Sequence, residues 1–277
     1  MMRTFQKNSL VKSPLRFPGG KSKAIKQIIQ HLPNNLSKYT EYREPFSGGG
    51  SMFIYLKQTY PNLDIWINDL NHELYLFWKM AQSDLKELVI ALREIKFNCT
   101  DGRKLFKKLT SVNVEELSDF ERAVRFFILN RITFSGTVES GGFSNQSFLT
   151  RFTDSSIDRL ENLQPILKDV RITNLDYSEV VNAGEDQVFI FLDPPYLATT
   201  QSKLYGKDGD LHTSFDHQRF AESLVNCQHK WLITYDNSEE IKNNFKNFNI
   251  IDWEFQYGMN NYKQVQAKKG KEIFIKN

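Results

Sequence analysis

The stretch that most constrains the fold is a run of five apolar residues that ends abruptly in an acid and two prolines. Residues Val188 to Leu192 fit a buried strand, and Asp193-Pro194-Pro195-Tyr196 follow directly. Proline fixes φ and has no backbone N–H, so this rigid turn presents carbonyl groups beside a carboxylate. Such acceptors suit an amine with two hydrogens to donate, and the tyrosine offers a face for stacking on a planar ring. A proline-rich turn with a capping aspartate is the alternative interpretation.

Strand-like and helix-like segments alternate along the rest of the chain. Further strands are predicted at 42–46, 65–67, 170–175 and 231–235, and helices at 22–31, 51–58 and 215–225. The tail, at 250–255 and 272–275, is expected to add closing antiparallel strands. This alternation predicts an α/β fold with a Rossmann-like, doubly wound sheet. Ligands bind such sheets beyond the carboxyl ends of the strands.

The alternation of strands and helices gives way to amphipathic helical segments in the middle of the chain, and this change predicts an insertion. Amphipathic helices are expected at 85–96 and 117–132, followed by a loop rich in Gly, Ser and Thr at 133–147. A length of 277 residues suits one catalytic domain with a sizeable insertion. We therefore predict a catalytic domain from residues 1–78 and 165–277 and a mainly helical domain from residues 79–164.

Three further short motifs lie next to predicted strands or helices. Residues 44–50 (Glu-Pro-Phe-Ser-Gly-Gly-Gly) join a strand to a helix, and their glycines let a ligand approach the backbone. They lack the spacing of a dinucleotide-binding loop. Asp69 ends the next strand, where an acid accepts from ribose hydroxyls or simply caps a helix. The last of the three motifs, at 18–22, places Lys21 at the start of a predicted helix. Such a position suits an anion, and the alternative interpretation is a plain helix N-terminus.

Composition excludes several classes of protein. The net charge of +3 is only weakly basic, so it does not by itself identify a nucleic-acid partner. The two cysteines and five histidines form no disulfide framework and no metal-ligand spacing, so no metal is expected. No apolar run reaches the length of a membrane span, and no signal peptide is evident. We expect a soluble, cytoplasmic protein with reduced cysteines.

Taken together, these motifs resemble the Dam-like adenine-N6 DNA methyltransferases. The resemblance extends over nearly the whole chain in separated blocks, and their order also matches. The blocks are residues 15–21, 44–50, 68–69, 176–177, 193–196 and 271–277. The combination is far more specific than any single block.

The resemblance implies S-adenosyl-L-methionine as the cofactor. Lys21 would pair with its methionyl carboxylate, Asp69 would hold the ribose hydroxyls, and Asp176 would accept from its adenine amino group. Tyr177 would pack on that adenine ring. The full set of implied cofactor-binding residues is Phe17, Lys21, Phe46, Gly48, Gly50, Asp69, Asp176 and Tyr177.

The resemblance also implies a catalytic pocket formed by Asp193, Pro194, Pro195 and Tyr196. The Asp193 carboxylate and the Pro194 carbonyl would each accept one N–H of the target adenine. This keeps electron density on a nitrogen that is otherwise a poor nucleophile. Because that nitrogen lies inside the stacked duplex, the base must flip out, with Tyr196 stacking on it.

The insertion would recognise double-stranded DNA, because residues 130–136 resemble the recognition block of the family. The candidate DNA-binding residues are Arg16, Asn130, Arg131, Ser135 and Glu139. Where the relatives have Asn-Gly and then an arginine, this chain has Ser135-Gly136 and Glu139. A carboxylate accepts from cytosine N4 but cannot donate to guanine. The sequence therefore does not imply the GATC target of these relatives.

Alternative functions remain open at this point. One is methylation of cytosine N4, RNA or a protein amide, and another is a DNA-binding regulator without turnover. The intact Asp193, Tyr196, Asp69 and Lys21 argue against the regulator. A nucleotide-hydrolysing P-loop protein is disfavoured because Leu15 stands where that motif needs glycine. A monomer or weak dimer is expected, with a cognate restriction endonuclease as a candidate partner.

Overall fold

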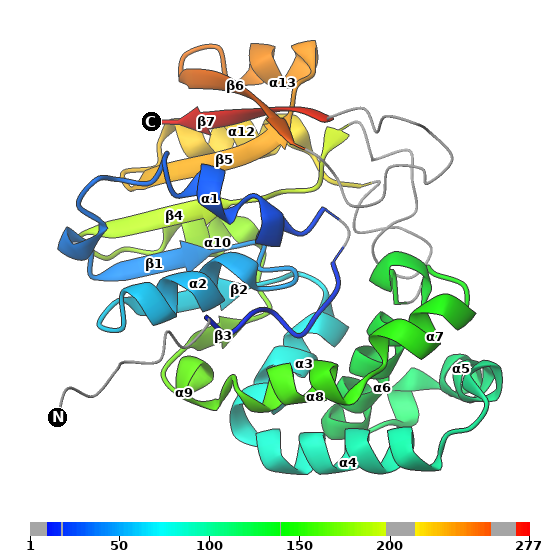
Figure 1. Ribbon diagram of the computed structural model, residues 1–277. Helices are drawn as coiled ribbons and strands as arrows, with labels where there is room; N and C mark the ends of the chain where they lie inside the picture. The colour runs from blue at the N-terminus through cyan, green and yellow to red at the C-terminus, as the bar shows by residue number, and fades with distance from the viewer. Residues whose placement is uncertain (1–9, 18, 139, 198–213, 256–269) are drawn as a thin grey trace, which may run out of the picture.

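A mixed seven-stranded sheet runs through the described part of the chain, which in this computed structural model comprises residues 10–17, 19–138, 140–197, 214–255 and 270–277 (Figure 1). The strand order is β3-β2-β1-β4-β5-β7-β6. The strands are β1 (Glu41–Glu44), β2 (Asp64–Asn68), β3 (Arg171–Thr173), β4 (Val188–Leu192), β5 (Lys230–Asp236), β6 (Asn249–Phe255) and β7 (Gly270–Lys276). Strands β1 to β5 are parallel, whereas β7 runs antiparallel to β5 and β6. This confirms the predicted α/β fold with antiparallel closing strands.

The order of the strands reverses between β1 and β4. From β1 the chain adds β2 and β3 on one side, and it later adds β4 and β5 on the other. Glu41 of β1 pairs with Val188 of β4, so the loops that follow these two strands leave the same edge of the sheet side by side. Such a switch point is where doubly wound sheets bind ligands.

Helices cover both faces of the sheet, and β4 is buried at all five positions as expected for a central parallel strand. The sequence predicts one helix over 22–31, and this prediction is wrong in detail. The N–H of Ala24 bonds to the carbonyl of Lys21 at 2.7 Å, which tightens the first turn into a 3₁₀ helix. The helices outside the insertion are η1 (Lys21–Lys23), α1 (Ile25–Ile28), η2 (Leu36–Lys38), α2 (Ser51–Thr59), α10 (Tyr177–Asn182), α12 (His217–Val225) and α13 (Glu239–Asn244).

The middle of the chain forms a helical layer beyond the β3 edge of the sheet (Figure 1). Helix α6 begins at a capping box in which Ser118 and Glu121 bond reciprocally to each other's backbone N–H. Within the predicted loop 133–147, Thr133 and Phe143 form an antiparallel bridge. The elements are α3 (His72–Ser83), α4 (Leu85–Asn98), α5 (Gly102–Ser111), η3 (Val114–Glu116), α6 (Asp119–Ile132), η4 (Phe134–Gly136), α7 (Asn145–Arg151), α8 (Asp154–Glu161) and α9 (Gln164–Leu167).

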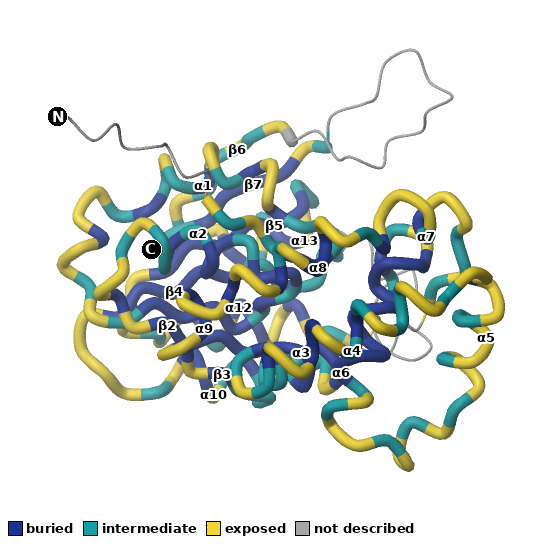
Figure 2. The backbone as a smooth tube through the Cα atoms, turned by 60° about the horizontal axis from the view of Figure 1, so that its bottom comes forward, coloured by how far each residue is buried: buried dark blue, intermediate teal, exposed yellow. Residues whose placement is uncertain are grey.

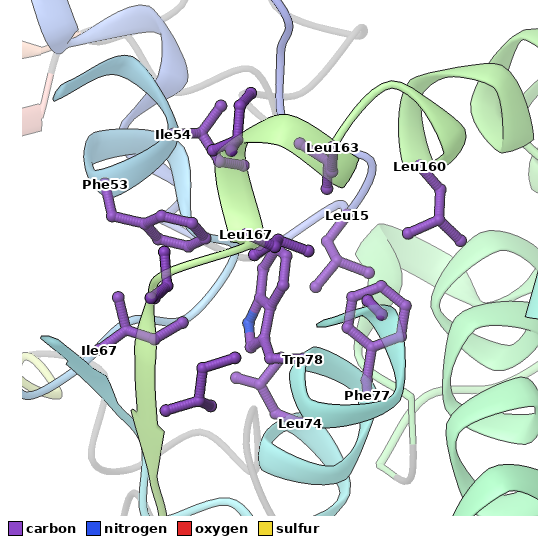
Figure 3. Packing of buried hydrophobic residues seen from close by; sticks show 14 of the residues in the cluster. Leu15, Phe53, Ile54, Ile67, Leu74, Phe77, Trp78, Leu160, Leu163 and Leu167 are labelled. Carbon is purple, nitrogen blue, oxygen red and sulfur yellow. The ribbon is translucent and has the colours of Figure 1, made fainter. Parts of the chain in front are cut away.

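One hydrophobic cluster joins the helical layer to the sheet. Trp78 of α3 packs among Phe53 of α2, Ile67 of β2 and Leu167 of α9 (Figure 3). The buried residues extend from the strands into α3 and α6, whereas α5 is largely exposed (Figure 2). The predicted domain boundary after residue 78 therefore falls inside α3, in the middle of a shared core. None of the helices in the described ranges combines the length and apolar character of a membrane span.

Candidate active site

A cavity of about 470 Å³ lies at the carboxyl ends of β1, β2 and β4. Its volume is within the range of small-molecule sites in proteins. The cavity brings together every residue that the sequence predicts for cofactor binding and catalysis. These are Phe17, Lys21, Phe46, Gly48, Gly50, Asp69, Asp176, Tyr177, Asp193, Pro194, Pro195 and Tyr196.

The three-glycine turn after β1 forms one wall. Gly48 and Gly50 have φ values of +46° and +70°, which are in the left-handed region that favours glycine. A Cβ atom on Gly50 would collide with the ring of Phe53 and lie 2.8 Å from the ring of Trp78. On Gly48 it would lie 3.0 Å from the ring of Phe17, so this ring rests directly on the turn. Glycine is therefore required here both by the backbone and by the close packing.

Asp69 connects this turn to the end of β2. Its Oδ2 accepts a hydrogen bond from the N–H of Gly48 at 2.9 Å, and its Oδ1 accepts one from the N–H of Asn71 at 3.0 Å. Burial raises the pKa of Asp69 to about 6 despite these two hydrogen bonds, which favour the ionised form. Each oxygen has a second lone pair, so the carboxylate retains acceptor capacity toward the cavity.

The buried side chain of Asn68 holds the ends of three strands together. Its Nδ2 donates to the carbonyls of Pro45 and Leu175 at 3.1 and 3.0 Å. Its Oδ1 accepts from the Thr173 hydroxyl and from the Leu175 N–H, both at 2.8 Å. Asn68 thus fixes the loops after β1, β2 and β3 relative to one another.

Another part of the cavity lining is aromatic, with a charged pair beside it. The ring of Tyr177 lies 5.5 Å from that of Phe46 and 5.7 Å from that of Phe215. Arg219 of α12 binds Asp176 with both terminal nitrogens, at 3.0 and 3.2 Å. Burial raises the pKa of Asp176, but hydrogen bonds from Ser178 and Arg219 outweigh it, so the pKa lies below its ordinary value. Asp176 is thus ionised at neutral pH and already paired.

Asp193 follows β4 and is anchored through one oxygen. Its Oδ1 lies 2.8 Å from Nζ of Lys21 and accepts a hydrogen bond from the Thr234 hydroxyl at 2.7 Å. The Lys21 ammonium also donates to the carbonyl of Gly19 at 3.1 Å. Within the described residues, Oδ2 of Asp193 has no hydrogen-bond partner, so it is the oxygen available to a ligand.

Contacts hold Tyr196 at its hydroxyl group, at its ring and at the backbone of the next residue. Its hydroxyl donates to Oε2 of Glu272 on β7 at 2.8 Å. The Lys21 ammonium lies 4.8 Å from the centre of its ring. The next residue, Leu197, donates its N–H to Oδ1 of Asp236 at 2.9 Å. The turn after β4 is therefore supported from the two C-terminal strands β5 and β7.

A further carboxyl group, that of Glu44, lines the cavity and is almost fully buried. Burial raises its pKa well above the ordinary value, even though the Tyr42 hydroxyl donates to it at 3.0 Å. The charges of Asp193 and Asp69 raise this pKa further. Glu44 therefore holds its proton more tightly than a carboxyl group in water. No group of three or more His, Cys, Asp or Glu in the described ranges is arranged to hold a metal ion.

Four of the predicted DNA-binding residues do not line this cavity: Arg16, Asn130, Arg131 and Ser135. Asn130 of α6 is fully buried; its Oδ1 accepts from the Arg16 N–H at 2.9 Å, and its Nδ2 donates to the Arg16 carbonyl at 2.6 Å. It also donates to the carbonyl of Gly136 at 3.2 Å. The Arg16 guanidinium donates to the Ser147 hydroxyl at 3.0 Å. Asn130 thus connects the helical layer to the segment that leads into the cavity at Phe17.

Arg131 belongs to a cluster of like charges. It is only 2% exposed, and its Nε is buried without a hydrogen-bond partner in the described structure. Burial lowers its pKa to about 9, and the charges of Arg159, Arg16 and Arg151 add to this effect. Ser135 lies in the following turn with φ of 55°, and Glu139 lies outside the described residues.

Several residues that shape the site were not singled out from the sequence. Thr234 is a polar residue in a predicted strand and Arg219 is one of many charged helix residues, so no local signal marks them. Glu272 lies in the block 271–277 that resembles the family, but the resemblance assigns it no role. Phe134 lies within residues 130–136, the block that resembles the recognition motif, but it was not among the predicted DNA-binding residues. It is 68% exposed and precedes Ser135. The sequence feature that could have marked Phe134 is an aromatic residue inside a loop rich in Gly and Ser.

Comparisons with known proteins agree with this geometry. The family model described as D12 class N6 adenine-specific DNA methyltransferase matches residues 17–259. The Type II methyltransferase M.MjaIII of Methanocaldococcus jannaschii is 29% identical over 67% of this chain and 69% of its own. M1.LlaDCHI of Lactococcus lactis subsp. cremoris is 25% identical over 79% and 76%. M.CviBI of Paramecium bursaria Chlorella virus NC1A is 23% identical over 95% and 96%.

The family match covers most of the chain, including the turns after β1 and β4 that build the cavity. It confirms the resemblance to Dam-like enzymes on which the sequence analysis relied. The reaction of this family, methylation of adenine N6, also accounts for a cavity that is lined by both acceptor oxygens and a glycine turn. The chain therefore belongs to the D12 class of N6 adenine-specific DNA methyltransferases.

Proposed function

We propose that this chain is a site-specific DNA methyltransferase that transfers a methyl group from S-adenosyl-L-methionine to N6 of an adenine flipped out of double-stranded DNA. One observation carries the proposal. Asp193, anchored through Oδ1 with Oδ2 available, lines the same cavity as the glycine turn after β1. A carboxylate that accepts from an amine thus lies within one cavity of a turn suited to a cofactor.

The residues of the cavity fit S-adenosyl-L-methionine. The Phe46 and Tyr177 rings offer an apolar surface for its adenine, and the buried hydroxyl of Tyr177 has no hydrogen-bond partner among the described residues. Asp69 retains lone pairs for the ribose hydroxyls. The left-handed glycines let the backbone approach the ligand. The residues that would hold the cofactor are Phe17, Lys21, Phe46, Gly48, Gly50, Asp69, Asp176 and Tyr177.

The turn after β4 would activate the acceptor nitrogen. Asp193 Oδ2 and the Pro194 carbonyl each accept one N–H of the adenine amino group, which keeps electron density on that nitrogen. Pro195 stiffens the turn, and the Tyr196 ring stacks on the extruded base. When bound, S-adenosylmethionine supplies a methyl group activated by its sulfonium. The proton lost from N6 goes to Asp193 or to solvent.

Lys21 has a second role in this proposal. Its ammonium neutralises Asp193 and fixes the carboxylate through Oδ1, so that Oδ2 is directed to the substrate. The pairing of Lys21 with the methionyl carboxylate stays a prediction. So does the pairing of Asp176 with the adenine of the cofactor, because Arg219 already engages both of its oxygens.

The helical layer from residue 79 to 164 would recognise duplex DNA. The clustered positive charges of Arg16, Arg151 and Arg159 suit a phosphate backbone, whereas the Arg131 side chain is buried among them. Because Asn130 is fully buried, we propose that it positions Arg16 instead of contacting DNA itself. A DNA substrate accords with action in the cytoplasm. The oligomeric state and a cognate restriction endonuclease stay predictions.

Binding of the cofactor should weaken in acid because of Asp69. Its raised pKa of about 6 means that one pH unit lower only about a tenth of the groups are ionised. The protonated acid accepts less well from ribose hydroxyls, so we expect affinity to fall about tenfold between pH 8 and pH 5. Calorimetric titration across this range measures it. Asp69→Asn should bind weakly and lose most of this pH dependence; an unchanged pH profile in that variant would contradict the role.

The same pKa shift has the opposite effect on folding. The native state holds the Asp69 proton more tightly than the unfolded state, for which the pKa is near 4. Its contribution to the free energy of unfolding is therefore fully present below about pH 4 and is lost as the pH rises through about 6. Stability and cofactor affinity should thus respond in opposite directions to this one group.

Phe134 should contribute to DNA binding by contacting bases. Its exposed ring follows helix α6 and precedes the strained Ser135, beside the arginine cluster. Loss of one aromatic–base contact costs about 1–3 kcal/mol, so Phe134→Ala should weaken duplex binding about tenfold. Phe97, an 89% exposed phenylalanine on α4, provides the matched control. Fluorescence anisotropy should show no change for Phe97→Ala, and equal losses in both variants would refute the assignment.

The nature of the methyl acceptor tests the proposed function. Purified protein is incubated with methyl-labelled S-adenosylmethionine and with duplex DNA, RNA or protein. We expect label in N6-methyladenine from duplex DNA only. Label in N4-methylcytosine, RNA or protein would replace the proposed acceptor, and DNA binding without any transfer would identify a catalytically silent regulator.

A further inference from the structure

A buried carboxylate on the closing strands contacts the catalytic turn. Glu272 of β7 is only 1% exposed, and its Oε2 accepts the hydroxyl hydrogen of Tyr196 at 2.8 Å. The two residues are 76 positions apart in the chain. A carboxylate that is taken out of water must be hydrogen-bonded to offset its lost hydration. The bond from the Tyr196 hydroxyl supplies one such partner.

Two further polar side chains on β5 bind the same turn. Thr234 donates to Asp193, and Asp236 accepts from the N–H of Leu197. Thr234 and Asp236 are two positions apart, so they lie on one face of the strand. Glu272 is the cross-strand partner of Asp236, which places it on that face as well. The antiparallel pair of β5 and β7, adjacent in Figure 1, thus supports the turn through three side chains.

We propose that Glu272 is a positioning residue for methyl transfer, acting through the Tyr196 hydroxyl. The hydroxyl lies at the far end of the ring from the backbone, so fixing it restricts both side-chain torsions of the tyrosine. The ring is then held in one orientation, with the Lys21 ammonium 4.8 Å from its centre. This inference rests on the proposed function, in which that ring stacks on the extruded adenine.

The proposal predicts an effect on turnover and not on the cofactor. A loosely held ring leaves the base able to adopt unproductive orientations, and misplacement of a reacting group slows transfer severely. Most of the residues that would hold the cofactor lie on other loops, at the ends of β1, β2 and β3, whereas Phe17 and Lys21 precede β1. The expected result is therefore a lower kcat with an unchanged KM for S-adenosylmethionine.

Four variants test the hydrogen bond itself: Tyr196→Phe, Glu272→Ala, the double variant, and Glu272→Gln. Tyr196→Phe and Glu272→Ala should each lower kcat about tenfold, the loss of about one strong hydrogen bond. The double variant should be no slower than either single variant, because both remove the same contact. Glu272→Gln should retain kcat within about twofold, since its amide oxygen accepts the same hydrogen. Asp252→Ala, which removes an exposed carboxylate from the neighbouring strand β6, should match the wild type.

Each outcome has one interpretation. Additive losses in the double variant, or a wild-type kcat for Tyr196→Phe, would overturn the positioning role. An equal loss in Glu272→Gln and Glu272→Ala would also overturn it, because charge and not hydrogen bonding would then matter. If Glu272→Ala does not fold, Tyr196→Phe alone tests the hydrogen bond, because it removes the donor and leaves Glu272 in place. A wild-type protein that never methylates adenine would instead refute the proposed function.

Discussion

Replacing Asp193 with alanine should slow methyl transfer by at least about 100-fold while cofactor binding stays close to that of the wild type. The carboxylate is the one charged acceptor that the turn after β4 offers to the substrate amine. Removing a group that stabilises charge in the transition state typically costs two to three orders of magnitude in kcat. Cofactor binding is spared because the residues proposed to hold the ligand lie mainly on the loops after β1, β2 and β3.

The buried ammonium of Lys21 complicates this variant, because Asp193→Ala leaves it without its counter-ion. Asp193→Asn keeps the volume and one acceptor oxygen, so it is the matched variant. We expect it to lose at least about tenfold in kcat, since its amide donates where a second acceptor lone pair is needed. Single-turnover rates and calorimetric binding of S-adenosylmethionine measure the two effects separately. Undiminished turnover in Asp193→Ala would refute the catalytic role.

Gly50→Ala should destabilise the protein by about 2–5 kcal/mol. The new Cβ would enter a site where φ is +70°, which costs an L-residue about 1–2 kcal/mol. It would also press on the rings of Phe53 and Trp78, and overpacking of this kind typically costs about 1–3 kcal/mol. Both rings belong to the core shared by the sheet and the helical layer, so neither is free to move aside.

Gly184 provides the control for this substitution. A Cβ atom there meets nothing within 4 Å, and its φ is not in the left-handed region. Gly184→Ala should change the free energy of unfolding by less than about 1 kcal/mol. Urea titrations of both variants measure the difference. Similar stability in the two would show that the glycine turn is not constrained as described.

The strand before the catalytic turn could be predicted residue by residue, and the physical reason is local. Five apolar side chains are buried on both faces of the sheet, and a proline that lacks an N–H ends the pairing at Leu192. For the first strand the residue pattern predicts an end at Phe46. It ends at Glu44, before Pro45, for the same reason.

The contents of the cavity could be predicted for a similar reason. Parallel strands bring their carboxyl ends to one edge, so motifs far apart in sequence meet if each follows a strand. Thr234 and Glu272 could not be predicted in this way. Their contacts to the turn span 41 and 76 residues and depend on the register of the closing strands. A lone threonine or glutamate in a strand carries no such information.

Asn130 illustrates a different limit of sequence reasoning. It stands beside Arg131 in a block that resembles a recognition motif, and both were predicted to bind DNA. In the structure its side-chain amide forms hydrogen bonds with the backbone N–H and carbonyl of Arg16, which is 114 positions away in the chain. Which polar residue of an insertion faces outward depends on how the insertion packs on the rest of the chain, and that packing has no local signal.

A structure of the protein with duplex DNA and a non-reactive analogue of S-adenosylmethionine tests the central claim most directly. The distances from the target nitrogen to Asp193 Oδ2 and to the Pro194 carbonyl oxygen are the quantities to measure. We predict that N6 of an extruded adenine lies about 3 Å from both oxygens, with its ring against Tyr196. An extruded base whose amino group contacts neither oxygen, or an adenine still stacked in the duplex of a competent complex, would contradict the account.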